Sequence, residues 1–293
     1  METAPQKRAL ITGVTGFVGK HLAQKLLDAG WDVHAIVRPT SDCSAVPLEV
    51  RRKVHLYIHE DEGSLVSIVR ESHPDVVMHL ASLFLTNHNY DDISSLIESN
   101  ITFGTTLLEA MKENGVRNFI NTGTAWQHYE NKEYSPVNLY AASKQAFEAM
   151  IRYYEEAAGL NVITLKLTDT YGEDDNRPKL WVTLKHMAES GGSLSMSPGE
   201  QKIDIVHVDD AAEAFALAAQ YLAEGKYVYC GSYVVSSGHA LPLKEVVTRY
   251  ERLLNARLDI HWGEKPYRKR EVMEPWNGGN LLPGWSRKHK ELM

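Results

Sequence analysis

The chain has 293 residues, of which 43% are hydrophobic, so it can bury a large core without help from disulfides or metals. Lysine and arginine number 31 against 38 aspartates and glutamates, and the net charge of −7 argues against nucleic acid as a partner. The two cysteines, Cys43 and Cys230, are too few for a disulfide framework or a four-cysteine zinc site, which favours a reducing compartment. With neither an apolar leader nor a membrane-length apolar run, we expect a cytoplasmic protein without membrane contact.

The first half of the chain alternates short runs rich in β-branched residues with longer helical patterns, an order typical of parallel strands joined by helices. Strands are expected at 8–12, 32–37, 54–58, 75–80, 116–122 and 161–167. Helices are expected at 17–29, 63–72, 91–114 and 138–158, with helix-ending glycines at Gly30, Gly115 and Gly159. The pattern predicts an α/β protein with a Rossmann-type doubly wound parallel sheet.

Beyond residue 167 this regular alternation stops. A polar loop at 172–179 precedes a helix near 180–190, and further short strands and a helix near 242–254 follow. We expect a dinucleotide-binding Rossmann domain formed by residues 1–167 together with 203–226. A smaller C-terminal substrate lobe would then consist of residues 168–202 and 227–293.

The segment TGVTGFVG lies between the first predicted strand and the first predicted helix, and its glycines are spaced three residues apart. Such glycines allow a tight turn, a close approach of the backbone to a pyrophosphate, and packing of the helix on the sheet. The helix N-terminus then faces the anion. A glycine triplet also suits a purely structural turn, but its place at the first strand–helix junction favours a dinucleotide site. The residues expected to contact the dinucleotide here are Gly13, Thr15, Gly16, Phe17, Val18 and Gly19.

The end of the second predicted strand distinguishes NAD from NADP. An acidic residue there binds the ribose 2′-hydroxyl, whereas an arginine accommodates a 2′-phosphate. This chain has Arg38, followed closely by Ser41, and no carboxylate occupies the strand end. A solvated surface arginine is the alternative interpretation. We therefore expect NADP(H) as the cofactor, with NAD(H) as the alternative.

The segment LYAASK places Tyr140 and Lys144 four residues apart on a predicted helix, so both side chains project from one face. This spacing alone also occurs in incidental surface pairs. The preceding strand ends in NTGTAW, which brings Thr124 to the carboxyl edge of the sheet, where ligands of open α/β folds bind. The three residues together predict a catalytic site.

With the glycine triplet, Thr124, Tyr140 and Lys144 in this order, the chain resembles the extended short-chain dehydrogenase/reductase family, also called the NAD-dependent epimerase/dehydratase family. The resemblance spans nearly the whole chain and includes HLAS at 79–82, DTYG at 169–172 and VHVDDAA at 206–212. It implies a nucleotide-sugar substrate in the smaller lobe and a homodimer through the helices at 91–114 and 138–158. It also adds to the cofactor site Leu80, Ala81, Ser82 and Asn100.

The resemblance further implies how the residues share the chemistry. Tyr140 would be the general acid/base, because a phenol with a pKa near 10 needs nearby positive charge to act at neutral pH. Lys144 would supply part of that charge and would hydrogen-bond the nicotinamide ribose. Thr124 would hold the reacting oxygen. Asn100 either supports the site or is an ordinary polar helix residue.

Two features of the sequence narrow the choice of reaction. Sugar 4,6-dehydratases of the family carry Asp-Glu directly after the catalytic threonine, whereas Ala125 and Trp126 follow Thr124 here, so elimination lacks its proton carriers. The segments around NTGTAW, PYRKREVMEPW and LPGW resemble the CDP-abequose and CDP-paratose synthases. We therefore expect NADPH-dependent reduction of a nucleotide-linked 4-keto-6-deoxyhexose at C4. The alternatives are a nucleotide-sugar 4-epimerase with retained NAD and a non-catalytic dinucleotide sensor.

Besides Thr124, five residues are expected to contact the substrate. Trp181 either stacks on the nucleobase or belongs to the core. Arg268 and Arg270 either clamp the diphosphate or form a solvated basic run. His128 either faces the sugar or packs, and Asp169 stands where sugar epimerases of the family carry asparagine.

Further positions bear on the binding of phosphate, adenine and metal. Ile203 stands where many relatives have a phosphate-binding arginine, which puts the usual diphosphate contacts in doubt. After the third predicted strand, His59, Glu60 and Asp61 are candidates for the acidic-residue position of this fold, and of these we expect Asp61 near the adenine. His55 and His59 lie across a predicted strand end with no assignable third ligand, so we predict no metal site.

Overall fold

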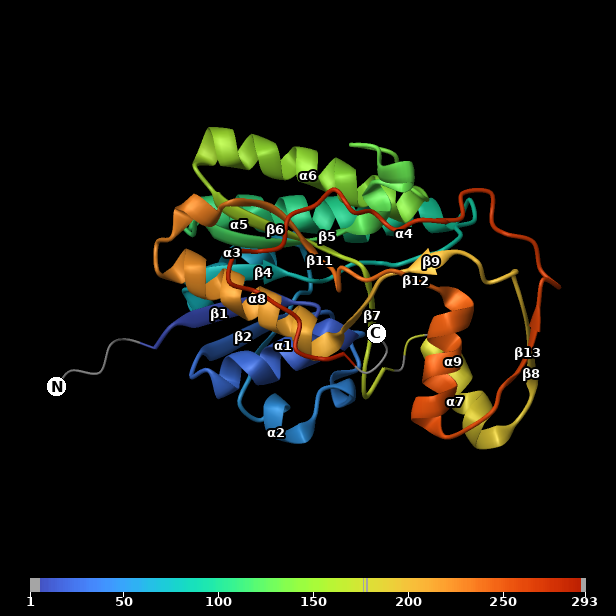
Figure 1. Cartoon of the computed structure of the whole chain (residues 1–293). Coiled ribbons are helices and arrows are strands. Elements are labelled where there is room, and N and C mark those ends of the chain that lie inside the picture. The colour runs from blue at the N-terminus through green and yellow to red at the C-terminus, as the bar shows by residue number, and fades with distance from the viewer. Residues whose placement is uncertain (1–5, 176, 178, 291–293) are drawn as a thin grey trace.

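The computed structural model describes residues 6–175, 177 and 179–290 (Figure 1). A seven-stranded sheet forms its centre, in the order β11-β6-β5-β4-β1-β2-β3. Every neighbouring pair in it is parallel. The strands are β1 (Arg8–Thr12), β2 (Asp32–Val37), β3 (His55–Ile58), β4 (Val76–His79), β5 (Asn118–Thr124), β6 (Asn161–Leu167) and β11 (Gly231–Val235). This confirms the predicted Rossmann-type α/β fold.

Helices cover both faces of the sheet, so consecutive residues of its inner strands are buried on alternate sides. In β1, Ala9 and Ile11 pack with α1 (Phe17–Asp28) and α8 (Val208–Ala223). Leu10 packs on the opposite side with α3 (Glu62–Ser72), α5 (Phe103–Glu113) and α6 (Leu139–Ala158). The short α2 (Leu48–Arg51) lies between β2 and β3.

The helix predicted at 91–114 is interrupted. It consists of α4 (Asp92–Ile97), a π-helical turn (Glu98–Thr102) and α5. Single π-helical turns inside helices are frequent at functional sites. The buried residue of this turn is Asn100, which is 1% exposed.

A smaller lobe contains α7 (Leu180–Ser190) and α9 (Leu243–Leu254), which lie side by side in Figure 1. Their buried faces share a core that includes Trp181, Leu184 and Val246. Three two-stranded sheets complete this part of the chain: β7 (Asp169–Tyr171) with β10 (Ile205–His207), β9 (Lys202–Ile203) with β12 (Leu241–Pro242), and β8 (Ser193–Met196) with β13 (Asp259–Trp262).

The structure differs from the predicted lobe range 227–293 in two places. Strand β11 pairs with β6 as an edge strand of the large sheet. Near the C-terminus, Leu282 and Trp285 pack in the core beneath α8, and the Trp285 indole donates to the Asp210 carbonyl at 2.9 Å. Both segments return to the large sheet through contacts with residues far away in the sequence, which no local pattern encodes.

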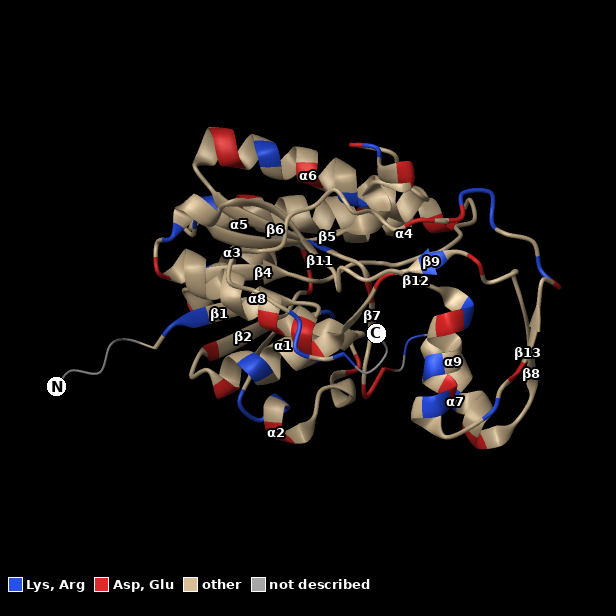
Figure 2. Cartoon of the chain, in the orientation of Figure 1, with Lys and Arg blue, Asp and Glu red and all other residues tan. Residues whose placement is uncertain are grey.

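Acidic and basic residues are interspersed along α6, α7 and α9, as is typical of solvated helix faces, whereas the charged residues of α8 are all acidic (Figure 2). Among the described residues, no helix is both long and apolar enough to span a membrane.

Candidate functional site

A cavity of about 500 Å³ lies at the carboxyl ends of β1, β2 and β4. In an open parallel sheet this edge is where ligands bind, because the strand–helix loops and helix N-termini converge there. Most of the predicted cofactor residues line it: Gly13, Thr15, Gly16, Arg38, Ser41, Leu80, Ala81 and Ser82.

The glycine loop is shaped by close backbone contacts. Gly13 has φ +78°, and a Cβ on it would lie 2.7 Å from the Ala81 nitrogen. A Cβ on Gly19 would overlap the Gly13 carbonyl. Helix α1 begins after Gly16 with no side-chain cap and no acidic residue in its first turn. Its positive end is therefore left for an anion such as a pyrophosphate.

Arg38 and Ser41 form a turn at the end of β2. The Ser41 backbone donates to the Arg38 carbonyl at 2.9 Å, and the Arg38 backbone donates to the Ser41 hydroxyl at 3.0 Å. Arg38 is exposed and pairs with no carboxylate in the described part of the chain. Its guanidinium is therefore available to a phosphate at this end of the cavity.

Seven predicted cofactor residues do not line this cavity: Phe17, Val18, Gly19, Asp61, Asn100, Tyr140 and Lys144. Asp61 caps α3 by accepting from the Ser64 backbone at 2.9 Å, and His59 rather than Asp61 lines the cavity. Val18 lines a neighbouring cavity, which also contains Thr124 and Tyr140. Phe17 is buried, and its ring lies 4.2 Å from the Arg177 guanidinium carbon.

Thr124, Tyr140 and Ser82 line one cavity of about 550 Å³. Thr124 is the last residue of β5, and Tyr140 lies in the first turn of α6, which Asn138 caps by accepting from the Ala141 backbone at 3.0 Å. Because Ser82 also lines the cofactor cavity, the two cavities meet at this residue. The tertiary structure thus brings Thr124 and Tyr140 together beside the expected cofactor site.

Burial shifts the pKa values of both members of the tyrosine–lysine pair. It raises the pKa of Tyr140 to about 12; a hydrogen bond with Ser82 opposes the rise and Asp169 adds to it. Burial lowers the pKa of Lys144 to about 8, with Glu148 acting in the opposite direction. The Lys144 ammonium is 1% exposed and has no hydrogen-bond partner among the described residues. A buried ammonium without a partner can donate a hydrogen bond to an acceptor atom of a ligand.

Asn100 ties the loop after β4 to helix α6. Its Oδ1 accepts from the Ser82 hydroxyl at 3.0 Å and from the Leu83 backbone at 2.7 Å. Its Nδ2 donates to the Leu83 carbonyl and to the Ser143 hydroxyl, both at 3.0 Å. Ser143 directly precedes Lys144, so Asn100 holds the loop after β4 and helix α6 in one arrangement.

A buried polar network that no sequence motif indicated lies behind Thr124. The Thr124 backbone donates to Gln127 at 2.9 Å, and Gln127 donates to Glu148 at 2.9 Å. Glu148 pairs with Lys166 at 3.3 Å, and Lys166 lies 2.9 Å from His128 Nε2. Burial, and then Lys166, lower the pKa of His128. The network fixes the end of β5 and therefore the position of Thr124.

A third cavity, of about 280 Å³, opens toward the smaller lobe. It shares Phe84, Trp126, Asp169 and Lys179 with the catalytic cavity, so a groove runs from the cofactor loop past Tyr140 into the lobe. Five of the six predicted substrate residues line it: His128, Asp169, Trp181, Arg268 and Arg270. The sixth, Thr124, lines the cavity that contains Tyr140.

These five side chains have different surroundings. Trp181 also belongs to the lobe core, and its stacking on a nucleobase stays a prediction. Arg268 pairs with Glu271 at 2.9 Å, and Arg270 donates to the Ser135 hydroxyl at 2.8 Å.

The two remaining predicted substrate residues also contact other side chains. The His128 ring stacks on Trp276, with 3.8 Å between the ring centroids, and both residues line the lobe cavity. Asp169 pairs with Lys179 at 3.3 Å.

Two basic residues of the loop after β7 reach the catalytic cavity without having been predicted. Lys179 lies with its ammonium 5.1 Å from the Phe84 ring centre, and Arg177 pairs with Asp175 at 2.7 Å. The only sequence signal was indirect: Ile203 replaces the family's usual arginine, which leaves a place for another cation. These residues make the groove suitable for an anionic substrate.

The residues present fit a dinucleotide. The crowded glycine loop leaves no room for side chains between the backbone and a ligand, and the buried Lys144 ammonium lacks a protein partner in the described structure. This fold with this loop defines a dinucleotide-dependent enzyme of the short-chain dehydrogenase/reductase class. The profile of the NAD dependent epimerase/dehydratase family matches residues 9–231, and the chain belongs to that family. Its members are NAD(P)-dependent enzymes.

Relatives extend over nearly the whole chain. The CDP-abequose synthase of Salmonella muenchen is 27% identical over 283 residues, which are 96% of this chain and 92% of that protein. The UDP-glucose 4-epimerase of Corynebacterium glutamicum is 27% identical over 265 residues, covering 82% of this chain and 78% of that protein.

Among solved structures, a UDP-glucose-4-epimerase from Stenotrophomonas maltophila with bound NAD and formylated UDP-arabinopyranose superposes with a TM-score of 0.86. It is 19% identical, and the match covers 98% of this chain and 95% of that one. At this identity the likeness shows a shared fold.

Replacing Tyr140 by phenylalanine should remove the proton donor while keeping the ring that contacts Phe84 at 4.9 Å between centroids. We expect kcat to fall by about 100-fold or more, with cofactor affinity near normal, because a positioned acid typically contributes 10²–10⁴-fold. Steady-state kinetics and cofactor titration measure both. Tyr153→Phe, on the exposed side of the same helix, is the control. Retention of more than about a tenth of the activity would remove Tyr140 from the proton-donor role.

Replacing Lys144 by methionine should raise the thermal midpoint at pH 7 by several degrees while abolishing activity, because a buried cation without a partner is removed. The pKa of Lys144 is lowered to about 8 in the fold, so wild-type stability recovers as the pH rises from 8 towards 10.5, and the variant's advantage should shrink there. Calorimetry across this range measures it. Lys166→Met removes the ion-pair partner of Glu148 and should instead lower the thermal midpoint. A destabilised Lys144→Met protein would contradict this account.

Proposed function

We propose that the protein reduces a nucleotide-linked 4-keto-6-deoxyhexose at C4, with NADPH as reductant. The observation that carries the proposal is the continuous groove, in which Thr124 and Tyr140 lie between a cofactor cavity with Arg38 at its edge and a lobe cavity lined by arginines. The full-length similarity to CDP-abequose synthases supports the choice of substrate class.

The chain's own residues account for binding, orientation and proton transfer. NADPH, when bound, supplies the hydride that the sugar carbonyl carbon receives. With a pKa near 12, Tyr140 carries its proton at neutral pH and donates it to the carbonyl oxygen, which becomes the product hydroxyl. Thr124 orients that oxygen. The Lys144 ammonium hydrogen-bonds the nicotinamide ribose and stabilises the tyrosinate that remains.

The lobe cavity accommodates the nucleotide portion of the substrate. Lys179, Arg268 and Arg270 offer charge to the diphosphate, and Trp181 lies where a base can stack. Asp169 and His128 face the same space and would contact the sugar. We also propose the 1–167 and 203–226 units as the cofactor domain, extended by β11. A homodimer and a cytoplasmic location remain predictions from the sequence.

The positions directly after Thr124 bear on competing reactions. Ala125 and Trp126 both line the lobe cavity, so the sites that carry Asp-Glu in dehydratases face the substrate here without a carboxylate. This argues against 4,6-dehydration. A 4-epimerase with retained NAD is the second candidate, favoured by the similarity to UDP-glucose 4-epimerases.

The reaction can be tested by following NADPH absorbance with CDP-, dTDP- and GDP-linked 4-keto-6-deoxyhexoses. One NADPH should disappear per product molecule, and C4-deuterated NADPH of the transferred face should leave one deuterium at the sugar C4. The Tyr140→Phe protein is the blank. An epimerase consumes no NADPH, so product formed without stoichiometric loss, or without deuterium, would replace the reductase by the epimerase.

Arg38→Ala should raise the KM for NADPH about tenfold or more and leave that for NADH nearly unchanged, because a charge-assisted phosphate contact contributes about 1.5–3 kcal/mol. Initial rates with each cofactor measure the change. Arg52→Ala, an exposed arginine after α2, is the matched control. Equal kcat/KM for NADPH and NADH in the unmodified protein would overturn the preference for NADP.

A further inference from the structure

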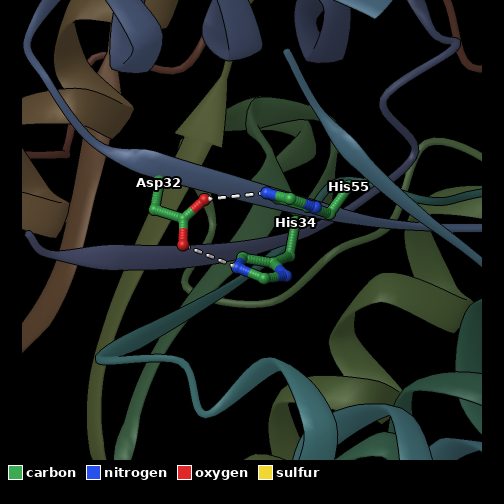
Figure 3. Close-up of side chains that lie close together, drawn as sticks. All are labelled: Asp32, His34 and His55. Atoms are coloured by element: carbon green, nitrogen blue, oxygen red, sulfur yellow. Dashed lines mark hydrogen bonds and ion pairs between the residues drawn. The ribbon is translucent and has the colours of Figure 1, made fainter. Parts of the chain in front are cut away.

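Three ligand-type side chains gather at the amino-terminal ends of β2 and β3 (Figure 3). His34 and His55 are direct partners in the parallel pairing of these strands. Asp32 precedes His34 by two residues, and residues two apart in a strand share a face of the sheet. The register of β2 against β3 therefore places all three side chains together.

Their geometry is compact. Asp32 Oδ2 lies 3.1 Å from His34 Nε2, and Asp32 Oδ1 lies 3.3 Å from His55 Nε2. The two imidazole rings are stacked with 4.7 Å between centroids. In Figure 3 each carboxylate oxygen faces one imidazole. One donor atom from each residue lies within 4.8 Å of the other two.

These donors match a divalent transition metal. Zn²⁺ binds imidazole nitrogen and carboxylate oxygen at about 2.0–2.2 Å, so the ligand atoms around one ion are roughly 3–4 Å apart. The present separations need only a small contraction. Two histidines and a carboxylate are also a known three-ligand set that leaves a position for water.

The surroundings of His34 prepare it as a ligand. Its Nδ1 lies 3.2 Å from the Tyr57 hydroxyl, which leaves Nε2 directed at Asp32. A partner on the second ring nitrogen is the usual way in which proteins orient a ligating histidine.

We propose that Asp32, His34 and His55 form a binding site for a divalent transition metal ion such as Zn²⁺. The site lies at the amino-terminal edge of the sheet, opposite the cofactor cavity at the carboxyl ends of the strands. It is therefore independent of the proposed reaction. Arg8 Nε lies 3.6 Å from Asp32 Oδ2 and competes with the cation, but the Arg8 side chain is 45% exposed and can turn away.

In a second cluster, formed by His207, Asp209 and His289, one donor atom from each residue also lies within 4.8 Å of the other two. Its groups are already engaged: Asp209 pairs with His21 at 2.8 Å, and His289 pairs with Asp210 at 3.1 Å. We therefore favour the first cluster and use the second as the matched control.

The test is a Zn²⁺ titration of the untagged full chain in competition with a chromophoric chelator, with Co²⁺ absorption as a report on coordination. We expect one Zn²⁺ per chain with a Kd below about 10 µM. His55→Gln should weaken binding at least tenfold; this histidine side chain is 61% exposed, so the fold should be unaffected, as circular dichroism can verify. Arg8→Ala should tighten binding.

His289→Gln should leave the affinity unchanged. The proposal is overturned if the unmodified chain binds no Zn²⁺ more tightly than about 100 µM, or if His55→Gln binds as well as wild type. It is equally overturned if only His289→Gln loses the ion, because the second cluster would then be the site.

Discussion

The parallel pairing of β1, β4, β5 and β6 is the constraint on which the rest of this structure depends. Since all four strands run the same way, their carboxyl ends meet at one edge, with the glycine loop, Ser82 and Thr124 each following or ending a strand. Burial of both sheet faces under helices holds that register, because a slip of one residue would exchange the two faces. The groove is a consequence of strand direction.

Holding such a groove requires polar groups inside the protein. Asn100 satisfies all its hydrogen bonds within the loop–helix junction, and Lys166 finds both Glu148 and His128. Lys144 differs, since its ammonium is buried without a described partner. A buried charge of this kind lowers stability, and it is retained where a ligand completes its hydrogen bonds. In the proposed function that ligand is the cofactor ribose.

The parallel pairing also brings side chains together at the opposite edge of the sheet, at the amino-terminal ends of the strands. The β2–β3 register that supports the cofactor end also sets His34 against His55, two residues from Asp32. Parallel strands place side chains in register at both ends, so one sheet can present two chemically unrelated clusters. The glycine-rich edge suits an anion, whereas the histidine–carboxylate edge suits a cation.

The sequence by itself determined the local elements: the strand–glycine–helix turn, the strand run at 161–167 and the helix at 180–190 all agree with the structure, because period and turn chemistry are local properties. It also identified several of the residues that line the groove, through spacing and family resemblance. Only the tertiary structure decided that β11 pairs with the large sheet and that Trp285 packs against its core. It also decided that Asp61 caps a helix. The pairing of Lys166 with Glu148, the pairing of Lys179 with Asp169, and the cluster of Asp32, His34 and His55 were likewise decided by the tertiary structure. Those outcomes depend on contacts between segments that are distant in the sequence. The register of one strand against its neighbour, for example, cannot be determined from either strand alone.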